Sequence, residues 1–215
     1  MNLDEVDLAA ELEKPRAPND SELNERISRA ILRWLRHGAT DLHQECFALF
    51  QLEQFAIKIE KALAPKCGPG FRTRLQSNVE QLVELEKIEL RGDKIRALYG
   101  HSLRGIIVGR MKWPEIPLFH ATSQRHLDSI LEHGLRPQGR TWVHLTSQTE
   151  YANRICKHHS FDGPAVMLQV DARRLKDHDV TFRQPNSHVW LANHVPPVGI
   201  LVCEPNGHSE IDKRI

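Results

Sequence analysis

The sequence has few features that would tie it to a metal, a disulfide framework or a membrane. Its four cysteines, Cys46, Cys67, Cys156 and Cys203, lie far apart, and no two of them form a CxxC pair. That spacing argues against a zinc site or a disulfide scaffold and fits a reducing cytosol. No apolar run reaches the roughly 18 residues needed to cross a bilayer. We therefore expect a cytoplasmic protein without a metal site or a membrane contact.

Net charge is also small. The chain has 29 Lys and Arg against 28 Asp and Glu, a formal charge of +1. A general polyanion-binding protein is usually more basic, so any contact with RNA would depend on a local patch of cations. Acidic residues gather in the first 25 positions, which lack the basic-then-apolar order of a signal peptide. We interpret residues 1–20 as a flexible leader.

Apolar residues recur at helical spacing in three segments of the first half. The first begins at Asp20 or Ser21 and ends at Gly38, and the others cover residues 47–64 and 72–86. The Pro- and Gly-rich residues 64–70 predict a loop between them. Strand-like runs at 87–90 and 95–98 flank Gly92 and predict a hairpin. Helices followed by a small hairpin indicate a winged-helix-like domain, here residues 21–110.

The pattern changes near residue 114, where short apolar runs begin to alternate with Gly, Pro and Asn. Helices are predicted at 123–133, closed by Gly134, and at 149–158. The runs with strand character are 118–121, 142–146, 166–170, 180–182, 189–191 and 199–203. This mixture predicts an α+β domain over residues 114–205, with 109–117 as the linker.

The end of the first predicted helix carries a candidate phosphate-binding pair. Arg36 could hold a phosphate with its guanidinium fork, and His37 could add a second donor. A helix C-terminus also stabilises positive charge by itself. An ordinary pair of helix-end cations is therefore the simpler interpretation of these two residues when they are taken alone.

Thirteen histidines supply further candidates. His120 and His144 each lie in a strand-like run and could face one cleft, where they would hold the ribose and pyrophosphate of a ligand. The alternative is a pair of core histidines satisfied by backbone carbonyls. The segment Gly100-His101-Ser102 follows a strand and could form a tight turn whose open N–H groups suit a phosphate or a ribose.

Short motifs along residues 22–202, taken in order, resemble the NAD-dependent RNA 2′-phosphotransferases. Each motif is short, but their shared order argues against coincidence. They are Ile27-Ser28-Arg29 with Leu35-Arg36-His37-Gly38, Ile95-Arg96-Ala97 with Gly100-His101-Ser102, Phe119-His120-Ala121-Thr122, Gly134-Leu135, Val143-His144-Leu145-Thr146, Val170-Asp171-Ala172, and Asn186 with Val189-Trp190-Leu191 and Val195-Pro196.

The resemblance implies an N-terminal winged-helix RNA-binding lobe and a C-terminal ADP-ribosyltransferase-like lobe. It also implies two substrates, NAD⁺ and an RNA with an internal 2′-phosphate, and no metal. The phosphate would attack the nicotinamide-bearing ribose carbon, releasing nicotinamide. A ribose hydroxyl would then attack that phosphate, giving 2′-OH RNA and ADP-ribose 1″,2″-cyclic phosphate. We expect a monomer.

The resemblance also assigns residues. Arg36 and His37 match the family's catalytic Arg-His pair, and Lys87 and His158 fall where two further arginines are expected. Arg154 or Lys157 could supply the charge that His158 lacks. The resemblance places His120 and His144 in the NAD⁺ cleft, and the full set of residues that we predict to bind NAD⁺ is Gly100, His101, Ser102, His120, Thr122, Arg140, His144 and Thr146.

Two departures leave other functions open. Lysine loses the bidentate fork of arginine, and histidine is only partly charged near neutral pH. One alternative is an ADP-ribosyltransferase that modifies a nucleic-acid phosphate or a protein and stops after the first step. The other is a non-catalytic nucleic-acid-binding protein that retains the fold.

Overall fold

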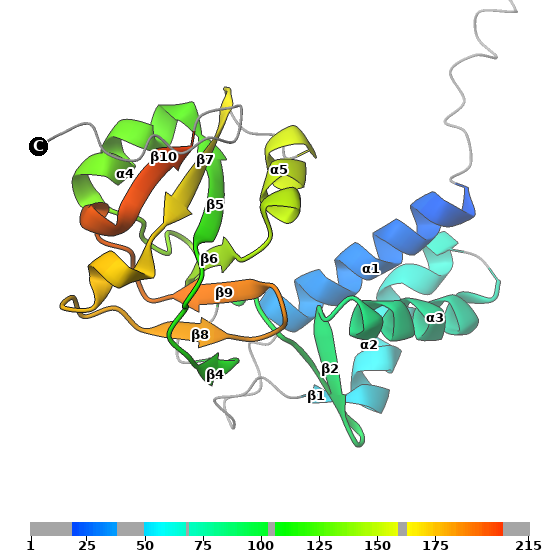
Figure 1. Cartoon of the computed structure of the whole chain (residues 1–215). Helices are drawn as coiled ribbons and strands as arrows, with labels where there is room; N and C mark the ends of the chain where they lie inside the picture. The colour runs from blue at the N-terminus through cyan, green and yellow to red at the C-terminus, as the bar shows by residue number, and fades with distance from the viewer. Residues whose placement is uncertain (1–18, 38–49, 68, 103–105, 159–162, 204–215) are drawn as a thin grey trace, which may run out of the picture.

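The computed structural model describes residues 19–37, 50–67, 69–102, 106–158 and 163–203, with the side chains of Phe50, Lys66 and His158 excepted. Three helices and a small sheet form the N-terminal part, residues 19–97. A larger sheet with two helices on it forms the C-terminal part, residues 106–203. Figure 1 shows the two parts side by side, with the C-terminal end of the first helix reaching the larger sheet. The protein is a mixed α+β structure, as predicted.

Helix α1 spans Asp20–His37 and packs through a row of apolar side chains four residues apart. That row, Leu23, Ile27, Ile31 and Leu35, is buried against α2 (Leu52–Cys67) and α3 (Phe71–Glu84). Asn19 caps the helix, because its Oδ1 accepts a bond from Glu22 N at 2.9 Å while the Glu22 carboxylate accepts from Asn19 N. The predicted caps, Asp20 and Ser21, were therefore wrong by one or two positions.

Two segments of the N-terminal part differ from the prediction. Helix α2 begins at Leu52, because Phe50–Gln51 form a short strand, β1, that pairs with Lys94 and Ile95. Residues 47–49, also predicted as helix, lie outside the described residues. At its other end α2 continues through Pro65 to Cys67, where a loop was predicted. A proline removes one backbone hydrogen bond and is unfavourable beyond the first turn of a helix, which is why the composition of this segment predicted a loop.

The predicted hairpin forms within one residue of its expected limits. Strand β2 (Ile88–Arg91) pairs antiparallel with β3 (Lys94–Ala97), and Gly92 turns between them with a φ of 61°. Ile88 and Ile95 pack into the core of the three helices. The hairpin therefore holds the residues on either side of it, Lys87 and Tyr99, in fixed places.

The C-terminal part contains a seven-stranded antiparallel sheet in the order β10-β7-β5-β6-β9-β8-β4. Helix α4 (Leu127–His133) follows β5, and α5 (Thr149–His158) packs on β5, β6 and β7. The strands are β4 (Arg110–Met111), β5 (Leu118–Ser123), β6 (Val143–Thr146), β7 (Ala165–Val170), β8 (Phe182–Gln184), β9 (Val189–Ala192) and β10 (Ile200–Cys203).

Strand β4 lies inside the segment predicted as a linker, where it pairs with β8 at the edge of the sheet. Gly109, just before it, has a φ of 74° and approaches the backbone at Gln184 and Pro185 so closely that a Cβ would lie 2.6 Å from Pro185 N. The connection between the two parts is therefore integrated into the sheet.

A small apolar cluster lies where the chain passes from the N-terminal to the C-terminal part. Tyr99, Ile106 and Val108 pack against Val189 and Leu191 of β9. Larger cores lie on either side of it, one among the three helices and the hairpin and one on the larger sheet. None of the helices in the described ranges is long and apolar enough to cross a membrane.

Candidate active site

A cavity of about 460 Å³ lies at the junction of the two parts, lined by α1, the ends of the hairpin, β5, β6 and α5. It brings together seven of the residues singled out in the sequence: Arg36, Lys87, Gly100, His120, Arg140, His144 and Thr146. Three of these are cations, and none of the described lining residues is acidic. The cavity is therefore electrostatically suited to anions.

Arg36 reaches into the cavity from the last turn of α1. Its guanidinium lies over the Tyr99 ring, with Cζ 5.0 Å from the ring centroid. Its Nε is buried and has no hydrogen-bond partner in the part of the chain that the structure describes. Burial lowers the pKa of Arg36, as does the nearby charge of Arg140, but a guanidinium stays protonated in proteins. A buried, charged and unsatisfied donor is costly unless a ligand accepts from it.

Gly100 allows this placement of Arg36. Its φ is 89°, and a Cβ added to it would lie 2.8 Å from Arg36 Nε. Two features therefore require glycine at this position: the left-handed backbone conformation and the close approach of the Arg36 guanidinium.

His37, the other member of the pair, does not line this cavity. It lines a neighbouring groove on α1, and its Nδ1 lies 2.8 Å from Ser102 Oγ. Burial and the charges of Arg36, Arg140 and Arg33 lower the pKa of His37. Ser102, which the resemblance assigns to NAD⁺, thus contacts His37, and its backbone N–H donates to the Arg36 carbonyl at 3.4 Å.

Lys87 lines the cavity from the start of the hairpin. Burial, together with the charges of Arg36 and Arg154, lowers the pKa of its ammonium. Arg154 is one of the two residues suggested to supply a missing charge, and its Cζ lies 5.0 Å from the ring centroid of the cavity-lining Tyr151. The side chain of His158, predicted as catalytic, lies outside the described residues.

Two strand histidines and a threonine line the opposite wall. His120 Nδ1 lies 2.9 Å from the His144 carbonyl. A carbonyl only accepts, so Nδ1 carries the proton and Nε2 is left as an acceptor. Burial lowers the pKa of His120, and it lowers that of His144 to about 3. Both imidazoles are therefore neutral near pH 7. His144 Nε2 is buried, and no described residue forms a hydrogen bond with it.

A second cavity, of about 860 Å³, adjoins the first and shares His120 and Arg140 with it. Thr122, predicted to bind NAD⁺, lines this second cavity. His101 lines neither: it is buried, its Nε2 lies 2.9 Å from the Ala97 carbonyl, and burial lowers its pKa to about 4. His101 therefore supports the turn around Gly100.

Sequence reasoning missed two aromatic residues of the cavity. Tyr99 lies between Arg36 and His144, with its ring centroid 6.2 Å from that of His144. Burial raises the pKa of Tyr99 to about 12. Tyr151 lies on α5, on the same face as Ala152 and Ile155. The helical spacing of these three was the signal available, but it indicates a packed face equally well.

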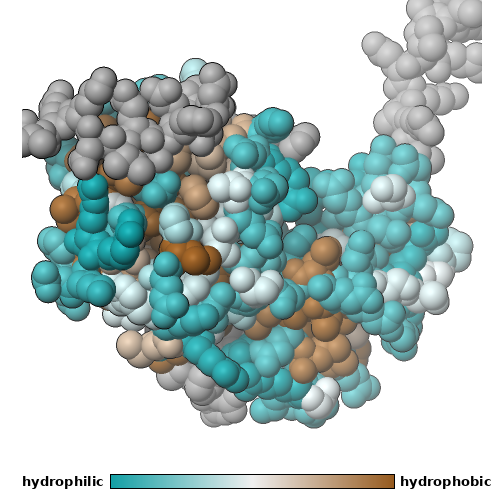
Figure 2. Space-filling view, in the orientation of Figure 1, coloured by the Kyte–Doolittle hydropathy of each residue, from teal (hydrophilic) through white to brown (hydrophobic). Residues whose placement is uncertain are grey.

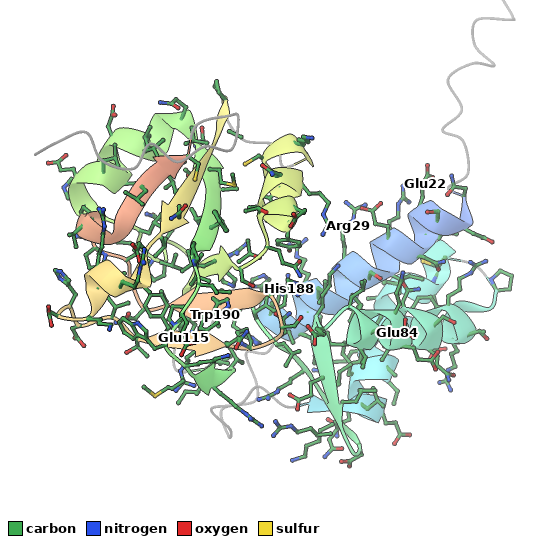
Figure 3. All side chains as sticks on the ribbon, viewed as in Figure 1. Glu22, Arg29, Glu84, Glu115, His188 and Trp190 are labelled. Carbon is green, nitrogen blue, oxygen red and sulfur yellow. The ribbon has the colours of Figure 1, made fainter. Side chains whose placement is uncertain are left out.

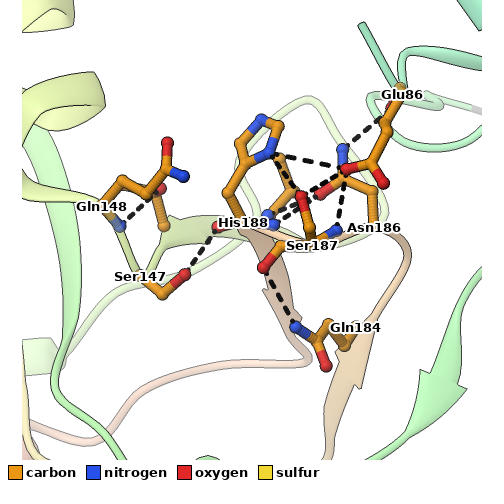
Figure 4. Close-up of polar contacts among 9 residues, drawn as sticks. Glu86, Ser147, Gln148, Gln184, Asn186, Ser187 and His188 are labelled. Atoms are coloured by element: carbon orange, nitrogen blue, oxygen red, sulfur yellow. Dashed lines mark hydrogen bonds and ion pairs between the residues drawn. The ribbon is translucent and has the colours of Figure 1, made fainter. Parts of the chain in front are cut away.

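A polar cluster ties the two parts together beside the cavity (Figure 4). The Glu86 carboxylate accepts from Ser187 Oγ and from Ser187 N at 3.0 Å, and the Glu86 carbonyl accepts from Asn186 Nδ2 at 2.8 Å. These bonds to Ser187 lower the pKa of Glu86. His188 continues the cluster to Tyr151, with ring centroids 5.4 Å apart. Figure 3 shows His188 at the junction of the two parts.

Comparison with known proteins decides the family. The model of the family described as "RNA 2′-phosphotransferase, Tpt1 / KptA family" matches residues 22–194. The chain belongs to this family. The match includes the last turn of α1, the hairpin and all the strands that line the cavity.

Individual relatives agree with this assignment. A protein of Archaeoglobus fulgidus named "probable RNA 2′-phosphotransferase 2" is 32% identical, over 85% of this chain and 82% of its own length. A "probable RNA 2′-phosphotransferase" of Acetivibrio thermocellus is 40% identical over 52% of this chain, and the matched segment spans 60% of that protein. The corresponding protein of Streptomyces coelicolor is 30% identical over 80% of this chain and 91% of its own length.

Proposed function

We propose that this protein is an NAD-dependent RNA 2′-phosphotransferase. It would move an internal RNA 2′-phosphate to NAD⁺, giving 2′-OH RNA, nicotinamide and ADP-ribose 1″,2″-cyclic phosphate. One observation supports this most strongly: the buried, unpartnered Nε of Arg36 lies in a cavity that also contains Lys87 and Arg140. A phosphate would satisfy that donor and neutralise these charges.

The arrangement also supports two functional lobes. Three helices followed by the β2–β3 hairpin fit a winged-helix-like RNA-binding lobe over residues 21–110. The seven-stranded antiparallel sheet fits an ADP-ribosyltransferase-like lobe over residues 114–205. The cavity at their junction would then receive one substrate from each side.

The donor set of the two adjoining cavities fits NAD⁺. The two cavities share His120 and Arg140, and the guanidinium of Arg140 can face a pyrophosphate. Neutral His120 presents Nε2 as an acceptor for a ribose hydroxyl. His144 has a buried Nε2 that needs a partner, and Thr146 supplies a hydroxyl. Bound NAD⁺ supplies the ribose carbon at which the RNA phosphate is accepted.

On the RNA side, Arg36 would grip the 2′-phosphate with its guanidinium, held in place by Tyr99 and Gly100. Lys87 would add a second charge from the hairpin. The two cations would stabilise the negative charge on the phosphate oxygens throughout the transfer. Stabilising this charge is the main requirement of phosphoryl-transfer chemistry. His37, oriented by Ser102, would contact the same phosphate or the adjoining ribose at the mouth of the cavity.

The test is incubation with NAD⁺ and a short RNA that carries an internal 2′-phosphate, followed by mass spectrometry of all products. We expect 2′-OH RNA together with nicotinamide and ADP-ribose 1″,2″-cyclic phosphate. RNA that remains joined to ADP-ribose would contradict the full reaction and identify a transferase that stops after the first step. Unconsumed NAD⁺, also with other acceptors, would identify a non-catalytic binding protein.

A further inference from the structure

A row of arginines covers one face of α1 next to its buried face. Arg26, Arg29 and Arg33 lead along the helix to Arg36 and His37. At about 100° per residue these five positions fall within about a third of the helix circumference. Together with Ala30 and Leu32 they line a groove of about 540 Å³. We call this the arginine groove.

These arginines form few ion pairs with other described residues. Arg29 forms an ion pair with Glu25 at 3.6 Å, and its side chain is 69% exposed. Arg26 and Arg33 are exposed and form no ion pair within the described residues. Exposed pairs of this kind are weak. In Figure 3, Arg29 projects from the side of α1 away from α3, and the surface over the N-terminal turns of α1 in Figure 2 is hydrophilic.

Helix stability does not explain the row. The helix dipole favours cations only within the last turn, which accounts for Arg36 and His37. Arg29 and Arg26 lie about two and about three turns before the end of the helix. The acidic residues of α1, by contrast, are confined to positions 20, 22 and 25 at its start. From Arg26 onward α1 is therefore cationic without any acidic side chain to offset the charge.

The groove is continuous with the active-site cavity, because Leu32 and Arg36 line both. At 1.5 Å per residue, Arg26 lies about 15 Å along the helix from Arg36, and Arg29 about 10 Å. A chain whose reacting phosphate contacts Arg36 could therefore place its flanking phosphates against Arg33, Arg29 and Arg26. A single nucleotide at Arg36 is too short to span that distance.

We propose that the arginine groove binds the phosphates of the single-stranded RNA segment that flanks the 2′-phosphate. This inference rests on the proposed function. Guanidinium groups bind phosphates through bidentate hydrogen bonds. The described residues that line the groove include no aromatic side chain on which a base could stack. The flanking segment is thus bound through its backbone, without sequence preference, and gives the protein a preference for longer RNA.

The test compares two RNAs, a dinucleotide with a 2′-phosphate and a ten-nucleotide RNA with the same modification at an internal position. Affinity is measured by calorimetry over a series of salt concentrations, for the wild type and for Arg26→Ala/Arg29→Ala. These two arginines are the farthest from the cavity. The control, Arg72→Ala/Arg91→Ala, removes two exposed arginines of the same part that do not line the groove.

For the ten-nucleotide RNA, the slope of log affinity against log salt should become shallower by about 1.4, since each phosphate contact on a single strand contributes about 0.7. The dinucleotide slope should not change, and the control should match the wild type. An unchanged slope for the long RNA would overturn the proposal. So would an equal loss for both RNAs, because that result indicates a disturbance at Arg36 itself.

Turnover of both RNAs by the wild type separates this proposal from the function on which it rests. Binding with the expected slope but without any 2′-OH RNA product would contradict the phosphotransferase and support the groove as an RNA-binding surface. Turnover of the dinucleotide, combined with an unchanged slope in the groove variant, would contradict the groove alone.

Discussion

Arg36 lines both the cavity and the arginine groove. Its guanidinium is held by Tyr99 on one side and by the backbone of Gly100 on the other, while Nε has no hydrogen-bond partner among the described residues. Leaving this buried donor unsatisfied costs free energy, and a phosphate that accepts its hydrogen bond would remove that cost. Pre-organised donors of this type act mainly on the transition state.

Replacing Arg36 should thus affect the reaction more than cofactor binding. Arg36→Ala should reduce product formation about 100-fold or more, the range typical of removing one pre-organised donor. NAD⁺ affinity, measured by calorimetry, should stay close to that of the wild type. Arg36→Lys keeps the charge but loses the fork, and should recover only part of the activity. Substantial turnover by the alanine variant would reject the role of Arg36.

Gly100→Ala provides a second test of the same guanidinium. The new Cβ would lie 2.8 Å from Arg36 Nε, and a displacement of about 1 Å at a reacting group can reduce the rate about 100-fold. Gly92→Ala is the matched control, because Gly92 also has a positive φ but no atom within 4 Å of the added Cβ. Both variants should lose about 1–2 kcal/mol of stability from backbone strain. Equal activity of the two would contradict the argument.

At the scale of elements, the turn between α3 and β2 connects the two parts. Glu86 adopts a φ of 50° there, and its carboxylate bonds Ser187 in the loop before β9. Lys87, a lining residue of the cavity, directly follows Glu86, and His188 contacts Tyr151, which lines the cavity from α5. The same cluster therefore fixes the position of the Lys87 wall relative to the Tyr151 wall. We infer that this connection, rather than the apolar cluster alone, sets the width of the cavity.

Glu86→Ala should loosen this connection. Alanine keeps the Cβ, so the backbone strain at residue 86 is unchanged while the carboxylate bonds are lost. Hydrogen exchange at the Ser187 amide should become faster, and the free energy of unfolding should fall by about 1 kcal/mol, since the bonds are partly exposed. The control is Glu84→Ala, an exposed position two residues earlier. Unchanged exchange at Ser187 would show that other contacts hold the two parts together.

For the whole molecule, buried neutral histidines predict a dependence of stability on pH. Burial lowers the pKa of His144 to about 3 and of His101 to about 4, and it also lowers those of His37 and His120. In the unfolded chain histidine titrates near pH 6.5. Below that pH the unfolded state takes up protons that the folded state does not, so stability falls as pH decreases.

The expected loss is about 1.4 kcal/mol per pH unit for each of His101 and His144, between about pH 6.5 and pH 4. Urea unfolding at half-unit steps from pH 8 to pH 5 would measure it, with m values checked for a two-state transition. Paired carboxylates contribute only nearer their own pKa values, so the range from 6.5 to 5 isolates the histidines. A flat profile in that range would contradict the neutral state assigned to them.

Much of the architecture follows from local patterns. The apolar periodicity of α1 and α5, the Gly92 hairpin and most strands lie within a few residues of their predicted limits, because each depends on neighbours close in sequence. Local patterns failed where distant pairing decided the structure. Phe50 and Gln51 form a strand because β3 lies beside them, and Arg110–Met111 extend the sheet because β8 offers an open edge.

The sequence by itself determined the family, through the order of its motifs, and with it the identity of Arg36, His120 and His144 as candidates. Only the tertiary structure decided which side chains share the cavity. It placed Lys87, Tyr99 and Tyr151 beside Arg36, moved His37 and Ser102 to its edge and left His101 in support of the turn. The reason is physical: contacts between residues far apart in the chain depend on how helices and sheets pack, which local spacing does not encode.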